Sequence, residues 1–313
     1  MVSNMTGTEI IMLLTQNVDS ICSVVGPIAG AIFTAVFLRN NTATKEFEKV
    51  KAGKLEEVAE DLLKSGKMTY TEFYKANNFL KIAKKADEEY VKLPMHPYKK
   101  VAYDFDWFMM FYETVGNISN DKMQQVWAKI LAGEINKPGT FSLRIIDVLK
   151  CISQEEAETF SKLCEHCVCV NTHLFLPNYE KYLKKCNINY SEIMLLDEMG
   201  LINSDGMVVL NVQLDSSPKA LFINRMQVMC ISSKEGTPKN LSIRQFPLTK
   251  VGDELAAALG NSLSDDDFIL FAKEVDADSK VNVEVHRISN IMNEQITYDD
   301  FDLLHGTSSE TGR

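Results

Sequence analysis

The sequence predicts a mainly α-helical chain with an α+β C-terminal part, and three features indicate this. Residues 20–38 form an uncharged apolar run of the kind found in membrane helices. Residues 42–166 repeat apolar side chains at three- and four-residue steps, as amphipathic helices do. From residue 167 onward, alternating β-branched runs mix with further helical patterns. Since 45% of the residues are hydrophobic and 24% are charged, most of the chain is expected to fold into packed cores.

The predicted parts follow one another along the chain. Pro94 and Pro97 interrupt the helical pattern and mark a boundary between two of them. We expect a membrane-associating helix at 1–40, a helical hairpin at 41–95, a helical domain at 96–166, a winged-helix-like α+β domain at 167–305 and a disordered tail at 306–313.

The apolar run at residues 20–38 decides the expected compartment. Its 19 residues would span about 28 Å as a helix, close to the hydrocarbon core of a bilayer. A secretory signal begins with basic residues, whereas the charges before this run are Glu9 and Asp19. Basic residues follow the run instead, which predicts a bacterial inner-membrane protein with its body in the cytoplasm. Because Gly26-Pro27 interrupts the run, a buried core helix or a surface amphipathic segment is the alternative.

Small residues recur within this run and predict a face for self-association. Gly26 and Gly30 form a GxxxG pair, and Ala31 and Ala35 repeat the same spacing. Such spacing lets helix backbones approach closely in lipid, so a homo-oligomer is one interpretation. The other interpretation is a chance pattern in a helix rich in glycine and alanine.

Capping patterns mark where the predicted helices of the next segments begin and end. A charged helix ends at Gly66, and Thr69 with Glu72 forms the capping-box pattern of a second helix that runs to about residue 90. Four further helices are predicted in residues 104–166. These patterns predict a helical hairpin followed by a small helical bundle.

Helices and strands alternate in the C-terminal part in the order of a winged helix. Two short helices are predicted at 178–186 and 191–199, and a turn and strands follow them. A helix, a short helix, a third helix and a two-stranded wing is the winged-helix order. The predicted strands cover residues 168–177, 207–212, 220–232, 241–246 and 281–288.

Acidic residues are concentrated at the C-terminal end. From Asp253 onward there are 14 acidic and 4 basic residues, which carry the whole formal net charge of −10. The chain therefore lacks the basic footprint of a nucleic-acid-binding protein. The candidate recognition helix carries Glu192, Asp197 and Glu198 and no basic residue, which disfavours approach to phosphates. The alternative is a soluble winged-helix regulator that binds nucleic acid through a small basic patch of Lys181, Lys184 and Lys185.

The sequence contains no recognisable catalytic signature, so we expect no enzyme and no cofactor. It has no GxxxxGK loop, no GxGxxG, no GxSxG and no HExxH pattern. A diverged nuclease that uses Asp104, Asp106 and Glu113 is the alternative. The two aspartates are better explained as caps at the start of an aromatic-rich helix.

Seven cysteines without a secreted spacing pattern indicate reduced thiols. Cys164, His166, Cys167, Cys169 and His173 are metal-ligating residue types close together in the sequence. If one strand begins at Cys167, however, His173 lies roughly 20 Å further along it. Zinc ligands all lie within about 2.3 Å of the ion, so we expect no metal here.

One stretch of the chain resembles a known bacterial family. The run Trp127-Ala128-Lys129-Ile130-Leu131-Ala132-Gly133-Glu134, followed by Lys137-Pro138-Gly139 and Ser142-Leu143-Arg144, is similar to the signature of domain-of-unknown-function family 2806. The later stretches LLDEMGLI and FPLTKVGDEL also resemble that family, so the resemblance covers about residues 100–275. The resemblance implies no activity, but it does imply a bacterial or phage-defence setting.

The residues of this signature admit two interpretations. A tryptophan at helical spacing is typical of a core, and Glu134 would then pair with Arg144 across the turn. Alternatively, Trp127, Lys129 and Arg144 line a partner surface. The acidic residues Asp265, Asp266 and Asp267 are a second candidate partner surface.

These observations together predict a membrane-tethered bacterial interaction or effector protein. Its winged-helix-like end would bind an unidentified protein partner, because winged helices also serve as protein-binding modules. Self-association of the apolar front segment would perturb the membrane, which suits a role in antiphage defence.

Overall fold

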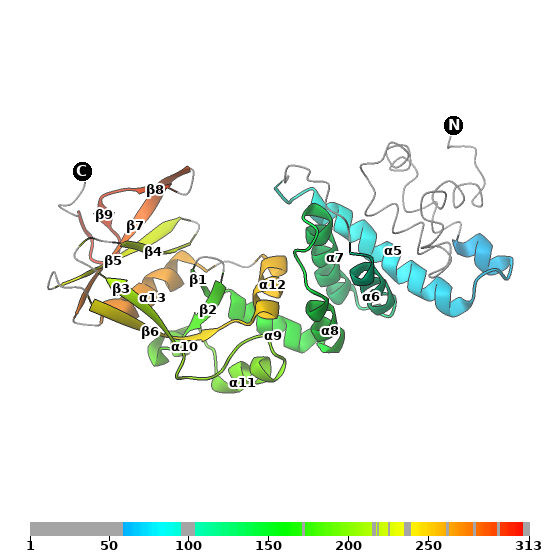
Figure 1. Cartoon of the computed structure of the whole chain (residues 1–313), viewed down its shortest axis with the longest axis horizontal. Helices are drawn as coiled ribbons and strands as arrows, with labels where there is room; N and C mark the ends of the chain where they lie inside the picture. The colour runs from blue at the N-terminus through cyan, green and yellow to red at the C-terminus, as the bar shows by residue number, and fades with distance from the viewer. Residues whose placement is uncertain are drawn as a thin grey trace. The chain divides into compact units, whose positions relative to one another are not determined.

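The computed structural model describes residues 59–94, 104–170, 173–214, 217, 219–224, 226–234, 239–260, 263–277, 280–292 and 295–308. The predicted membrane run, with Gly26, Gly30, Ala31 and Ala35, lies outside these residues. Among the helices that are described, none is both long and apolar enough to cross a bilayer. The described chain is α+β, and it divides into two compact units, Met1–Cys151 and Ile152–Arg313 (Figure 1).

The described part of the first unit is helical, and the capping pattern predicted for its long helix is present. A preceding helix ends at Gly66, which has a φ of +70°. Thr69 and Glu72 then form a reciprocal capping box at the start of α5. The helices are α5 (Tyr70–Tyr90), α6 (Phe105–Val115), α7 (Asp121–Asn136) and α8 (Leu143–Cys151).

Aromatic side chains fill the core of the first unit. Helix α5 packs against α7 and α6, and α6 also packs against α8. The ring of Phe79 on α5 meets Phe108 and Phe111 of α6 edge-on, with centroids 6.0 and 6.2 Å apart. Phe111 in turn meets Trp127 of α7 edge-on at 5.5 Å. The second helix of the predicted hairpin is therefore part of the same packed unit as the predicted bundle.

The second unit begins one helix earlier than the boundary at residue 166 that the sequence suggested. Helix α9 (Gln154–Cys164) contacts α11 (Tyr190–Glu198) and α12 (Lys250–Leu259), which lie further along the chain in the second unit. The structural division therefore falls between α8 and α9.

An antiparallel sheet in the second unit has the strand order β1-β2-β6-β3. The single strand predicted at 168–177 is wrong, because Val170 pairs with His173 and the chain reverses between them. Two short helices connect β2 to β3, as predicted. The elements are β1 (Val168–Val170), β2 (His173–Pro177), α10 (Glu180–Lys185), α11 (Tyr190–Glu198), β3 (Val209–Leu214) and β6 (Lys239–Pro247).

A second antiparallel sheet, in the order β4-β5-β7-β8, is built partly from an insertion between β3 and β6. Here too one predicted strand, at 220–232, is a hairpin of two. Asn224 makes the turn, because its side-chain oxygen accepts the amides of Met226 and Gln227. The remaining elements are β4 (Lys219–Ile223), β5 (Gln227–Ser233), α12 (Lys250–Leu259), α13 (Asp265–Asp276), β7 (Val281–Met292) and β8 (Gln295–Tyr298).

The end of the described chain is a short hairpin where the sequence suggested a tail from residue 306. Strands β9 (Phe301–Asp302) and β10 (Thr307–Ser308) pair with each other. Asp302 also accepts the backbone amide of Val285 at 3.0 Å, which fastens the hairpin to the middle of β7.

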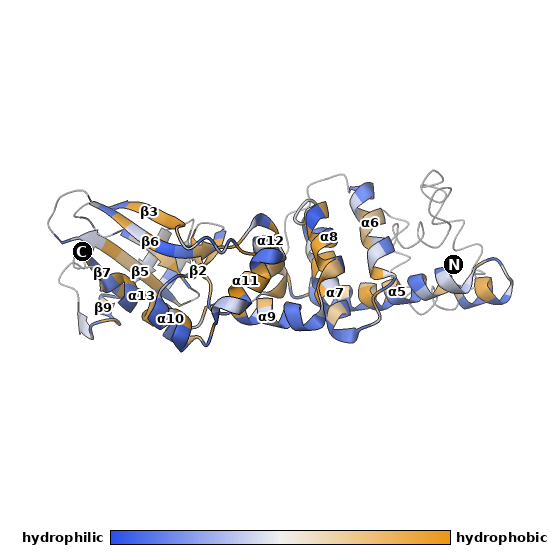
Figure 2. Ribbon diagram, turned by 90° about the horizontal axis from the view of Figure 1, so that it is seen from below, coloured by the Kyte–Doolittle hydropathy of each residue, from blue (hydrophilic) through white to orange (hydrophobic). Residues whose placement is uncertain are grey.

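Three aromatic rings join the two sheets to α13. Phe175 of β2 lies edge-on at 6.0 Å to both Phe222 of β4 and Phe271 of α13, and the latter two are 5.3 Å apart. Helix α13 also contacts β7 and β5. Much of the hydrophobic character of this unit lies in its strands, whereas α10 is largely hydrophilic, as Figure 2 shows.

Candidate functional site

The family-like signature in the first unit folds around a buried carboxylate. Glu134, only 3% exposed, accepts the backbone amide of Gly139 at 2.6 Å and that of Phe141 at 3.0 Å. Burial raises the pKa of this carboxyl, and these hydrogen bonds partly offset the rise. Arg144 is exposed, and the described residues show no ion pair between it and Glu134, so the possible pairing of the two is absent. The Lys-Pro-Gly turn reverses the chain after α7, so that backbone amides following it donate hydrogen bonds to this carboxylate.

The signature residues predicted to form a partner surface are not exposed together. Trp127 is 0% exposed, and its indole N–H has no hydrogen-bond partner among the described residues. Lys129 is half-buried and Arg144 is exposed. Trp127 is therefore a core residue, and of these three side chains Arg144 alone is fully presented to solvent.

The three acids considered for a nuclease are not brought together as one site. Asp104 caps α6 by accepting the amide of Trp107 at 3.1 Å, as expected for a helix start. Glu113 pairs with Lys75 of α5. Within the described chain, Asp104, Asp106 and Glu113 do not form a group with the spacing of metal ligands.

Helix α11 presents an aromatic and methionine face. Tyr190 is 61% exposed and Met194, one turn later, is 36% exposed; Glu198 follows on the same side. The other two acids of this helix are engaged within the fold. Glu192 caps the helix and pairs with Lys162 at 2.9 Å, and Asp197 accepts Ser204 at 3.0 Å.

The basic and acidic patches predicted elsewhere in the second unit are small. Lys181, Lys184 and Lys185 are exposed on α10. Of the three predicted partner acids, Asp265 and Asp266 are both exposed, and Asp265 also accepts the side chain of Asn224 at 2.9 Å. Asp267 is partly buried and contacts side chains of other elements, so only two acids of the triplet face solvent fully.

A cluster that spacing did not predict lies around Asp267. Its carboxylate is 3.1 Å from Nδ1 of His166 and 3.9 Å from Sγ of Cys186. The ligand atoms of these three residues all lie within 4.8 Å of one another, and no other such group is found in the described part of the chain. Burial, together with the charge of Asp267, raises the pKa of the Cys186 thiol to about 12.

The other residues first considered as metal ligands stand apart from this cluster. Burial raises the pKa of the Cys164 and Cys167 thiols, so both are protonated thiols. His173 contacts Asp253 of α12 at 2.8 Å. Of the sequence candidates, only His166 belongs to the group, and its partners lie far along the chain.

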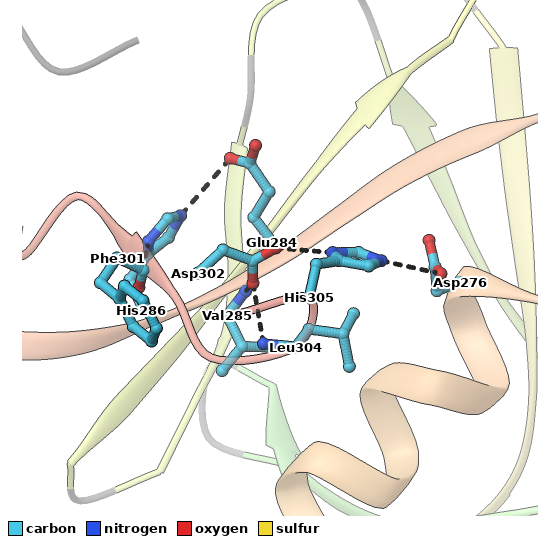
Figure 3. Close-up of polar contacts among 8 residues, drawn as sticks. All are labelled: Asp276, Glu284, Val285, His286, Phe301, Asp302, Leu304 and His305. Carbon is cyan, nitrogen blue, oxygen red and sulfur yellow. Dashed lines mark hydrogen bonds and ion pairs between the residues drawn. The ribbon is translucent and has the colours of Figure 1, made fainter. Parts of the chain in front are cut away.

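A second polar cluster fastens the C-terminal hairpin, as Figure 3 shows. His305 lies between two carboxylates, with Nδ1 2.6 Å from Asp302 and Nε2 3.3 Å from Asp276 at the end of α13. The hydrogen bond to Asp302 is the main cause of a raised His305 pKa, and Asp276 adds to it. Nearby, His286 is buried between the carbonyl of Phe301 and Glu284.

Comparison with known proteins identifies a family and no activity. The family model described as "Protein of unknown function (DUF2806)" matches residues 67–270. Because this match covers most of the chain, the protein belongs to that family. The match begins just before the first residue of α5, so the similarity to the family extends further toward the N-terminus than the sequence motifs indicated. No curated protein and no solved structure matches the chain.

Proposed function

We propose that this member of the family is a membrane-tethered bacterial interaction protein whose second unit binds a protein partner through α11. The observation that carries the proposal is the exposed face of α11, formed by Tyr190, Met194 and Glu198. Tyrosine and methionine are enriched in protein interfaces, whereas a helix that reads nucleic acid needs basic or amide side chains.

The connectivity around α11 supports a winged-helix-like assignment. Helix α9, the strands β1 and β2, α10, α11 and the strands β3 and β6 follow one another, so this chain has a two-stranded hairpin where the winged-helix order has one strand. As in that fold, β6 lies between β2 and β3 in the sheet. Helix α11 then takes the place of the recognition helix. In this chain the wing connection between β3 and β6 contains the β4–β5 hairpin, which belongs to the second sheet.

In-cell photo-crosslinking tests the α11 face. A photoreactive amino acid at Ser191, which is exposed beside that face, is expected to give a discrete adduct with one protein. Met194→Asp and Tyr190→Ala are expected to reduce the adduct strongly, because they remove the apolar contact. The matched control is Tyr70→Ala, which removes an exposed tyrosine of α5 in the first unit. No adduct, or an adduct unchanged by Met194→Asp, contradicts the proposal.

The exposed lysines of α10 favour one alternative, a soluble regulator that binds nucleic acid. It predicts that the full chain retards duplex DNA at low salt and that reversing Lys181, Lys184 and Lys185 to glutamate abolishes this. We expect no retardation, because three lysines beside an apolar and acidic helix neutralise few phosphates. The other alternative, a diverged nuclease, predicts that the parent cleaves nucleic acid and that Asp106→Ala does not. We expect no cleavage by the parent.

The membrane tether rests on the charge-free run at residues 20–38 and the basic residues that follow it. Fractionation with carbonate and detergent washes tests it. The full chain is expected to stay with the membrane through carbonate, and a chain lacking residues 1–39 is expected to be soluble. The full-length variant with Ala29→Asp and Ile32→Asp is the matched control for the truncation. It should also appear in the soluble fraction, because charged side chains within a membrane segment are costly. Both forms being soluble would instead assign the run to a core or an oligomer interface.

A role in defence against phage is part of this proposal, and it rests on the bacterial or phage-defence setting that the resemblance implies. Self-association of the front segment, through Gly26, Gly30, Ala31 and Ala35, would perturb the membrane of an infected cell. Expression of the chain is expected to reduce phage plating, and Ala29→Asp with Ile32→Asp should restore it. Protection that survives these substitutions contradicts the membrane mechanism.

A further inference from the structure

We infer that His166, Cys186 and Asp267 form a zinc-binding site in the second unit. Each residue comes from a different element. His166 lies in the turn after α9, Cys186 caps the C-terminal end of α10, and Asp267 is in the first turn of α13. Their ligand atoms all lie within 4.8 Å of one another.

The distances suit a shared ion after small side-chain adjustments. Two ligands at about 2.1 Å from one tetrahedral ion lie about 3.4 Å apart. Asp267 Oδ2 is 3.1 Å from His166 Nδ1, and its other oxygen is 3.9 Å from the Cys186 sulfur. A thiol–carboxylate contact of this length is weak as a hydrogen bond, whereas a bound cation would draw both groups inward.

The donor set selects the metal. One imidazole nitrogen, one thiolate sulfur and one carboxylate oxygen are all ligands that zinc accepts, whereas magnesium and calcium require oxygen donors. Three protein ligands leave the fourth tetrahedral position to water or an incoming ligand. Cys186 is buried and the other two side chains are partly exposed, so an ion can reach the site from solvent.

Neighbouring residues hold the ligands in place. The hydroxyl of Ser264 donates to Asp267 Oδ2 at 2.8 Å, which orients the carboxylate. The hydroxyl of the buried Tyr182 donates to the carbonyl of His166 at 2.7 Å, which fixes the turn after α9. Such supporting hydrogen bonds are typical of metal sites. A bound ion would fasten α10 and the α9–β1 turn to α13, and through α13 to the second sheet.

Zinc titration of the metal-free full-length chain tests the site. A competing chromophoric chelator should report one zinc ion per chain. Cys186→Ser and His166→Gln should each lower the affinity by more than about 100-fold, since loss of a direct ligand exceeds the loss caused by a supporting residue. Ser264→Ala should lower it by about 10-fold. Cys151→Ser, which changes an exposed cysteine of the first unit, is the matched control and should bind as the parent does.

Cobalt substitution identifies the sulfur ligand directly. The cobalt-loaded chain should show a thiolate-to-metal charge-transfer band that Cys151→Ser keeps and Cys186→Ser loses. Should Cys186→Ser fail to fold by circular dichroism, His166→Gln and Asp267→Asn, which preserve side-chain size, decide the matter. The proposal is overturned if the parent binds no stoichiometric zinc, or if any folded variant of the three ligands binds zinc as tightly as the parent.

Discussion

Two buried polar side chains of the first unit, those of Asn78 and Glu134, bind its own backbone, whereas the described histidines, all in the second unit, each meet a carboxylate. In the first unit Asn78 donates to the carbonyl of Gly116, and Glu134 accepts two backbone amides. In the second unit His166 meets Asp267, His173 meets Asp253, His286 meets Glu284, and His305 meets both Asp302 and Asp276. The first unit is thus expected to respond mainly to changes in packing, and the second also to protons and metal ions.

The largest expected effect is in the aromatic core of the first unit. Trp127→Ala should lower the free energy of unfolding by about 3–5 kcal/mol, because it leaves a cavity where Phe111 and its neighbours close around the indole. Trp127→Phe should cost far less, since it keeps most of the apolar volume and removes a buried N–H that lacks a partner among the described residues. Urea unfolding measures both, and equal losses would contradict this account of the core.

The next effect compares two helix glycines, one in each unit. A Cβ at Gly252 would lie 2.1 Å from the carbonyl oxygen of Leu201, whereas one at Gly133 would lie 2.6 Å from the ring of Phe141. A ring can move aside more easily than a backbone carbonyl. Gly252→Ala should therefore lower the free energy of unfolding by about 1–3 kcal/mol or more, and Gly133→Ala should lower it by less. Thermal unfolding tests the order, and a greater cost at Gly133 would reverse it.

Replacing the buried carboxylate of the first unit should also be costly. In Glu134→Gln a single amide oxygen faces two backbone N–H groups, so one of them loses its acceptor, at about 1–3 kcal/mol. Glu113→Gln is the matched control, because its exposed pair with Lys75 should contribute less than about 1 kcal/mol. Chemical denaturation measures both, and a neutral Glu134→Gln would mean that the turn does not depend on this carboxylate.

The smallest predicted effect is the pH response of the C-terminal hairpin. The pKa of His305 is raised in the folded chain, so its stabilising contribution is present below the unfolded pKa. That contribution is lost as pH rises through the folded pKa. Because His305 is half-exposed, the change should be below about 1 kcal/mol. The free energy of unfolding of the second unit, measured from pH 6 to 9, should fall as pH rises in the parent. The fall should be smaller in His305→Gln, and identical profiles in the two proteins would count against the contact with Asp302.

Local signals in the sequence predicted the helices well. The Thr69–Glu72 capping box, the cap at Asp104 and the helix end at Gly66 are all present. These signals depend on residues within one turn of one another, so the chain reveals them without its tertiary structure. Membership of the family was likewise predictable, because its motifs are read directly from the sequence.

Long-range features could not be read in the same way. The two hairpin reversals divide runs that were predicted as single strands. The polar residues at these points, Asn171-Thr172-His173 and Asn224-Arg225, include no glycine or proline, which are the strongest sequence signals of a turn. Asp267 lies 101 residues after His166, so no spacing rule joins them. Glu134 and Arg144 are opposite in charge and lie on either side of one turn, yet the carboxylate binds the backbone amides of that turn instead.

Hydrogen exchange of the full chain, with and without zinc, tests the contrast between the units most directly. Local exchange rates report the stability of each segment separately. The account predicts that zinc increases protection in the second unit, most of all at the turn after α9, the end of α10 and the first turn of α13, and leaves α5 to α8 unchanged. A zinc-dependent increase in protection that is equal in both units, or no increase at those three segments, would contradict the account.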